Sequence, residues 1–349
     1  MALGDWGSLL VYADTAMGID RSNREALALR KRARAELQDL ASREAPQSDQ
    51  PGIIEGLQPI RRPAGTNVQS AAASVRELVP VPVEFVSSIF AERSPAELAE
   101  LASSDPRIVS RLLAIANDQR PGKREYRSAT EAVDALGTRQ VRALALASVL
   151  ADAFNETTVV SHRDFWRFSL VVGALADLLA TNGGFEHDLI FAAGAVHNLG
   201  LLGLDVMDPD GVREVLAAEA VAGRRVHDRE RYVFGFSDAD LGAELARAWG
   251  FPEALVNVIS SQRRDTAELE DREHLALSTY VVQARIFGRA HGLADGIESS
   301  RPRHDVPRPW DSTSIAGELK RIGGPMSLQK RYSAFLEAPE LEQLRSRVA

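Results

Sequence analysis

A series of helix-start signals that recurs from residue 94 onward constrains the fold more than any other feature of this sequence. Ser94–Glu97 combines an N-cap serine, a proline at the first helical position and a glutamate three residues after the cap. Asp105–Pro106 repeats the cap and proline, Ser128–Glu131 is another capping box, and Ser161–Asp164 precedes a long apolar helical run. No alternating strand pattern of comparable strength appears in the sequence. The sequence therefore predicts an all-α fold.

The absence of cysteine from the 349 residues narrows the chemistry. It excludes disulfides, zinc–thiolate sites, iron–sulfur clusters and thiol nucleophiles. The first residues, MALGDWGSLLVYADTAMGID, carry acids where a secretory signal carries bases, and their apolar stretch Leu9–Tyr12 is too short for such a signal. We therefore expect a cytoplasmic protein.

Charge and apolar patterning exclude two classes of partner. The net charge is −8, from 41 basic and 49 acidic residues, so the chain lacks the basic excess that holds a phosphate backbone. We expect no nucleic-acid partner. The longest apolar run, Leu189–Leu204, includes His197 and Asn198 and is shorter than a membrane span. It predicts a buried core helix and no membrane insertion.

Four regions separate along the chain on composition. Residues 1–44 form a helical extension whose helix follows a capping box at Ser22–Glu25. Residues 45–74 contain scattered proline and glycine without sustained periodicity, which is typical of a linker. We expect one helical domain over residues 75–294. A helical tail over residues 295–349 follows, and the sequence does not decide whether this tail packs on the core.

Several segments resemble those of one bacterial family, and they occur in the order expected for it. The resemblance is to the HDOD domain, a relative of the HD metal phosphohydrolases. It implies a multi-helix domain in which an N-terminal helical subdomain packs on a degenerate HD-type core. The matching segments are LVPVPVEF, LASSDPRIVSRLLAIAN, SATEAVDALGTRQVRALAL, FWRFSL, FAAGAVHNLGLL and FGFSDADLGAELARAWGFPEALVNVI.

The same resemblance implies that the metal ligands of catalytic relatives are missing here. Those relatives use a histidine on one helix, an adjacent His-Asp on another and an aspartate further along. Phe168 stands at the place of the first histidine, and His197–Asn198 stands at the place of His-Asp. Asp238 or Asp240 occupies the neighbourhood of another histidine, and Ser261–Gln262 that of a histidine pair. One imidazole cannot assemble a dinuclear site, so we expect no catalytic residues, no bound metal and no cofactor.

The polar pair His197–Asn198 marks the candidate pocket for a ligand or partner. Each side chain would cost about 1–3 kcal/mol if buried without a hydrogen bond, so we expect both to have partners. Two interpretations remain: a satisfied core pair left from an old metal site, which we favour, or a pocket for a nucleotide or other ligand. Trp166 is typical of core packing, and Arg142 of either a solvated surface or an anion contact. The candidate residues are His197, Asn198, Phe168, Trp166, Asp238 and Arg142.

The resemblance predicts a non-catalytic regulatory adaptor that acts through protein–protein contacts with signalling proteins. Cyclic-dinucleotide signalling, chemotaxis and motility are the processes it suggests. Two alternatives stay open. One is a residual metal-dependent HD-type nucleotide phosphohydrolase, and the other is a metal-free sensor that binds a cyclic-dinucleotide second messenger in the old pocket.

Overall fold

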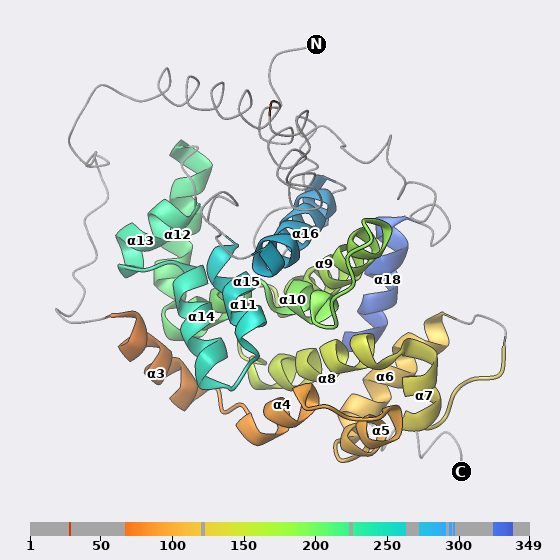
Figure 1. Cartoon of the computed structure of the whole chain (residues 1–349). Coiled ribbons are helices and arrows are strands. Elements are labelled where there is room, and N and C mark those ends of the chain that lie inside the picture. Colours follow the sequence, from red (N-terminus) through yellow and green to blue (C-terminus); the bar gives the residue numbers. More distant parts are fainter. Residues whose placement is uncertain are drawn as a thin grey trace.

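The computed structural model describes residue 28 and residues 67–119, 123–222, 226–262, 272–290, 293–294, 296 and 324–337. Every regular element within these ranges is a helix, which confirms the predicted all-α fold (Figure 1). The helices of the first half are α3 Val68–Leu78, α4 Val83–Phe90, α5 Pro95–Ser103, α6 Pro106–Asp118, α7 Ala129–Leu136 and α8 Thr138–Ala153. Those of the second half are α9 His162–Asn182, α10 Ile190–Val196, α11 Leu199–Met207, α12 Pro209–Ala222, α13 Val226–Phe234, α14 Asp238–Ala248, α15 Glu253–Ser261, α16 Arg272–Ala290 and α18 Pro325–Leu336.

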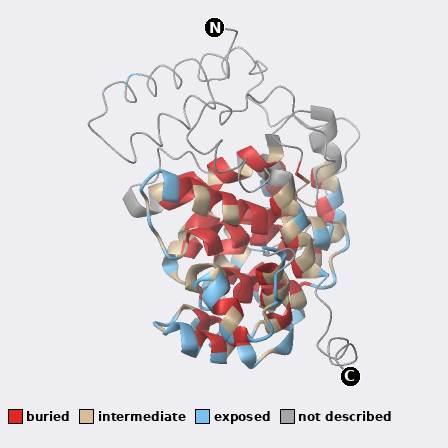
Figure 2. Cartoon of the chain, turned by 90° about the vertical axis from the view of Figure 1, so that its right-hand side faces the viewer, coloured by how far each residue is buried: buried red, intermediate tan, exposed pale blue. Residues whose placement is uncertain are grey.

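The helices form two groups that share one hydrophobic core. In the first group, α5, α6 and α7 pack on one another and on α8, and α4 covers another part of α8 (Figure 1). In the second, α9 packs on α10 and α16, while α14 packs on α11 and α15. The contacts of α10 with both α8 and α9 join the groups. Figure 2 shows the buried residues running continuously through the middle of this body.

The predicted helix caps form as the sequence indicates, with one exception. The Ser94 side chain accepts a hydrogen bond from the Glu97 amide, and Glu97 Oε2 accepts from the Ser94 amide at 2.8 Å. Asp105 caps α6 by accepting from the Arg107 amide at 2.8 Å. The exception is α8, which begins without a side-chain cap. The structure places Gly137 at the cap position, with a φ of 77°, because this residue also ends α7 and must reverse the chain.

The long apolar run predicted as one buried helix is broken into two. Helix α10 ends at Val196, and α11 begins at Leu199 after a non-helical Asn198 with φ −111° and ψ 20°. The window Ile190–Met207 is long and apolar enough to cross a membrane by length and composition, but 89% of it is buried inside the fold. Burial in the core, as predicted, is therefore confirmed, while the single helix is not.

Helices also lie beyond both ends of the domain predicted over residues 75–294. Helix α3 starts at Val68, capped by Asn67, so residues 68–74 of the predicted linker are helical. The rest of that linker lies outside the described residues, as does the predicted N-terminal helix apart from Ala28. Within the predicted tail, α18 packs on α9 and α6, and its Phe335 is fully buried. The described part of the tail therefore belongs to the core.

Candidate functional site

The break between α10 and α11 places two polar side chains inside the core. His197 is 1% exposed and Asn198 is 6% exposed. His197 Nδ1 lies 2.7 Å from the carbonyl oxygen of Gly194. Because a carbonyl oxygen only accepts, Nδ1 carries a proton and donates it. This bond fixes the imidazole orientation, as second-shell carbonyls do for metal-ligating histidines.

Phe168 of α9 fills the space next to this histidine. Its ring centroid lies 6.3 Å from that of His197, and the side chain is 3% exposed. On its other side the ring approaches α16 so closely that a Cβ added to Gly288 would lie 3.1 Å from Phe168 Cε2. The aromatic ring therefore occupies the junction of α9, α16 and the α10–α11 break. Its carbon atoms offer no lone pair to a metal.

Asp238, another predicted site residue, reaches the same region through its backbone. It begins α14, is fully buried, and its carbonyl oxygen would lie 1.8 Å from a Cβ added to Gly200 of α11. Only glycine allows α11 and α14 to approach this closely. The Asp238 carboxylate accepts a hydrogen bond from the Ala239 amide at 2.8 Å, and the Asp238 amide donates to Glu230 Oε2 at 3.0 Å. These bonds stabilise the start of α14.

The two remaining predicted residues take part in other contacts. Trp166 is fully buried, and since it is two positions from Phe168 on α9 it points to a different face of that helix. It packs edge-on against Phe165 at 5.2 Å between ring centroids. Arg142 of α8 donates from Nη2 to the carbonyl oxygen of Ala91, just after α4, at 3.2 Å. Trp166 is therefore a core residue, and Arg142 joins α8 to α4.

Helices α15 and α16 contribute a second set of buried polar side chains. Ser261 and Ser278 are 4% and 2% exposed, and their hydroxyl oxygens are 2.9 Å apart. Gln262, 3% exposed, follows at the end of α15. Neither its amide nitrogen nor its amide oxygen has a hydrogen-bond partner within the described part of the chain. A buried amide left in this way costs free energy, so Gln262 is a polar group that its surroundings do not explain.

Several other side chains around the α9, α10, α15 and α16 contacts share this property. Each is buried and has a polar atom without a hydrogen-bond partner: Asn198 Oδ1, Ser169 Oγ and Thr279 Oγ1. The expectation that Asn198 is fully satisfied is therefore wrong for its oxygen. Sequence reasoning missed Ser169 and Thr279, although both are hydroxyl residues within otherwise apolar helical runs.

The donor set does not fit a metal centre. Among the residues that the structure describes, no three His, Cys, Asp or Glu side chains are grouped so that they could hold a metal ion. Phe168, which packs beside His197, and Asn198, which follows it in the chain, supply no negative charge. A divalent phosphohydrolase centre requires several anionic or imidazole ligands, with open positions for water. We therefore derive no chemistry through a metal at this site.

Comparison with known proteins identifies a matching family and a protein of similar sequence. The family model of the HDOD domain matches residues 86–264. A curated protein of Treponema pallidum (strain Nichols), itself uncharacterized, is 27% identical over 168 residues, which is 47% of this chain and 32% of that protein. This chain thus matches about a third of the length of that curated relative.

Three solved structures share the arrangement of helices. An HDOD domain protein of unknown function from Geobacter sulfurreducens has a TM-score of 0.60 at 20% identity, covering 77% of this chain and 100% of that one. A protein of Shewanella amazonensis SB2B, provisionally named a phosphohydrolase, has a TM-score of 0.58 at 22% identity, covering 77% and 97%. A provisionally named signal transduction protein of Marinobacter aquaeolei VT8 has 0.56 at 20%, covering 87% and 64%.

Proposed function

The chain belongs to the HDOD domain family, and we propose that it is a non-catalytic signalling protein that acts on partner proteins through direct contacts. The observation that carries the proposal is the packing of Phe168 against His197, at 6.3 Å between ring centroids. In catalytic relatives of the family, the resemblance puts a metal-binding histidine at the place of Phe168. A buried aromatic ring there removes a ligand and also fills the volume that a metal and its water would need.

Asn198 supports the same proposal. The resemblance puts an aspartate of the metal site at this place, and asparagine offers a carbonyl oxygen without the compensating charge. Its Oδ1 has no hydrogen-bond partner in the fold. A neutral amide and one imidazole give too little negative charge to hold two divalent cations. Roles in cyclic-dinucleotide signalling, chemotaxis or motility belong to this proposal.

The test is metal analysis combined with an activity assay on the purified chain. We expect no stoichiometric manganese, iron or magnesium, and no hydrolysis of bis(p-nitrophenyl) phosphate or cyclic di-GMP with added Mn²⁺. Asn198→Asp should create no activity while Phe168 remains. The matched control is His197→Ala, which removes the one imidazole of the site. Hydrolysis by the unaltered protein that disappears in His197→Ala would contradict the proposal.

A second candidate function rests on the unpaired amide of Gln262 and the unpaired oxygen of Asn198. Buried hydrogen-bonding groups of this kind can bind a small polar ligand, so a metal-free sensor of a cyclic dinucleotide remains a separate proposal. Calorimetric titration with cyclic di-GMP and cyclic di-AMP tests it. Binding that weakens in Gln262→Leu supports the sensor, and no binding of either nucleotide removes it.

A further inference from the structure

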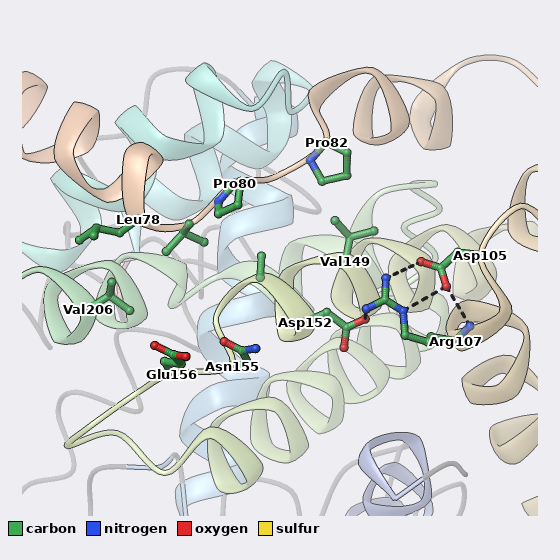
Figure 3. A pocket seen from close by; sticks show the side chains of 12 residues that line it. Leu78, Pro80, Pro82, Asp105, Arg107, Val149, Asp152, Asn155, Glu156 and Val206 are labelled. Atoms are coloured by element: carbon green, nitrogen blue, oxygen red, sulfur yellow. Dashed lines mark hydrogen bonds and ion pairs between the residues drawn. The ribbon is translucent and has the colours of Figure 1, made fainter. Parts of the chain in front are cut away.

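A groove of about 580 Å³ lies beside α8, and none of the residues predicted for the His197 site lines it (Figure 3). One wall is the extended segment between α3 and α4, which includes Pro80 and Pro82. The other wall is a single face of α8, where Val149, Asp152 and Ala153 lie at helical spacing. The groove is therefore bounded by two regular, closely spaced stretches of chain.

The lining of the groove is rich in hydrogen-bond acceptors. Prolines have no backbone N–H, so Pro80 and Pro82 remove two donors from one wall. Carboxylates line the groove at Asp105, Asp152 and Glu156. Arg107 is the one cationic side chain among the described residues that line it. Its guanidinium is already paired with Asp105 at 2.9 Å and with Asp152 at 3.2 Å (Figure 3).

Two polar side chains at the end of α8 remain available to a partner. Asn155 and Glu156 are both exposed and follow the last turn of the helix. Neither forms a hydrogen bond or ion pair with another residue that the structure describes. Asp152 is paired with two arginines, Arg107 at 3.2 Å and Arg111 at 2.6 Å. The Glu156 carboxylate therefore leaves the groove with an uncompensated negative charge beside its apolar walls.

The groove is built on a fixed frame, which lowers the conformational entropy that the groove itself loses when a partner binds. Asp205 of α11, 1% exposed, accepts hydrogen bonds from the amides of Thr158, Val159 and Val160 at 2.8–3.0 Å. This holds the segment after Glu156, and the neighbouring Val206 lines the groove. The end of α8 is held as well, because Arg111 donates to the Ser148 carbonyl at 2.9 Å and stacks on Phe335 of α18 at 5.1 Å.

An exposed apolar rim accompanies these acceptors. Leu78, at the end of α3, is 61% exposed and lines the groove. Val83, at the start of α4, is 37% exposed on the other side of the two prolines. Two large hydrophobic side chains are therefore exposed on either side of this extended segment.

From these observations, and resting on the proposed adaptor function, we infer that the groove binds an arginine or lysine side chain within an extended, apolar segment of a partner protein. Arginine and lysine side chains only donate hydrogen bonds, and their positive charge would compensate the Glu156 carboxylate. Their methylene stems can pack on apolar surface, here that of Pro80 and Ala153, while the charged end stays in water. Apolar neighbours of the basic residue would then cover Leu78.

The experiment selects ligands without assuming a partner. A phage-displayed library of random dodecapeptides is panned against the full chain, and the dissociation constants of selected synthetic peptides are measured by fluorescence polarization. We expect enrichment of arginine or lysine next to apolar residues. Hydrogen exchange should show protection over residues 78–82 and 149–156 on binding. Glu156→Lys should weaken binding by about tenfold or more, as loss of a close charge pair does.

The matched control is Glu125→Lys, which makes the same charge change at an exposed glutamate that does not line the groove. Its peptide affinity should equal that of the unaltered chain. Peptides without basic residues, or equal losses in both variants, would overturn the inference. Sedimentation of the chain alone tests for self-association. If the chain self-associates and Glu156→Lys abolishes this, a second copy of the chain occupies the groove, and the inference of a separate partner protein is overturned. Phosphoester hydrolysis would defeat the proposed function but leave these peptide results unchanged.

Discussion

The region around His197 and the groove beside Pro80 differ in how their polar groups are arranged. In the core, Asn198 Oδ1 and both side-chain polar atoms of Gln262 are buried without hydrogen-bond partners among the described residues, and the Phe168 ring packs beside His197. In the groove, Asp152 is paired with two arginines, while Glu156 is left exposed to solvent. The first region therefore contains unpaired neutral polar groups, and the second contains paired and solvent-exposed charges.

Burial explains what this difference means for function. Unpaired polar groups in the core lower stability and gain nothing from water, so they suit either a bound ligand or the remains of a former site. Charges at a half-exposed groove can stay solvated until a partner arrives, and they then contribute specificity and association rate. On the proposed function, the interior of this chain serves mainly for packing, and its contacts with partners use the surface.

The largest expected effect tests whether Phe168 is a packing residue. Phe168→Ala should lower the free energy of unfolding by about 3–5 kcal/mol, because it removes a buried ring that touches both His197 and Gly288. Urea denaturation followed by circular dichroism measures it. Phe185→Ala is the matched control, and because that ring is only half-buried, its loss should be smaller. A loss below about 1 kcal/mol for Phe168→Ala would show that the ring is not needed to fill the former site.

The next effect concerns the frame of the groove. Asp205→Ala should lower the free energy of unfolding by about 3 kcal/mol, because three backbone amides lose their acceptor. It should also increase hydrogen exchange over residues 158–160. Asp210→Ala removes a carboxylate whose side chain is 85% exposed, and its effect should stay within about 0.5 kcal/mol. Equal effects in the two variants would mean that the groove is not held by Asp205.

The sequence predicted these two regions unequally. Capping boxes and apolar periodicity depend on residues close in sequence, so the helix starts near Ser94, Asp105 and Ser161 were predictable. The resemblance also identified Phe168 and Asn198. The groove was not predicted, because it depends on contacts between distant segments, such as Asp205 with residues 158–160 and Arg111 with Phe335. No local sequence pattern shows which loop a buried aspartate will contact.

A smaller effect separates an inherited polar core from a ligand site. Gln262→Leu should leave the free energy of unfolding unchanged or raise it by up to about 1 kcal/mol, because both polar atoms of the amide lack partners. Gln262→Glu is the matched contrast of similar shape, and it should destabilise the protein by burying a charge. Thermal unfolding of both variants measures the difference. A loss of about 2 kcal/mol or more for the leucine variant would indicate that the amide is satisfied in solution by a bound molecule.

The smallest effect is a pH dependence at His162, which interacts with Arg111 and Asp152 beside the groove. Burial is the largest cause of its lowered pKa, and Arg111 of the groove network lowers it further, whereas the Ala151 carbonyl at 2.8 Å and Asp152 act in the opposite direction. Because the folded pKa lies below the unfolded value near 6.5, the unfolded chain binds the proton more readily. Stability from this group is therefore present above pH 6.5 and lost as the pH falls towards the folded pKa.

His162→Gln keeps a donor for the Ala151 carbonyl but does not titrate, so urea midpoints measured from pH 7.5 to 5.5 should fall less steeply in this variant. Identical slopes would show that the pKa of His162 is not lowered in the folded protein.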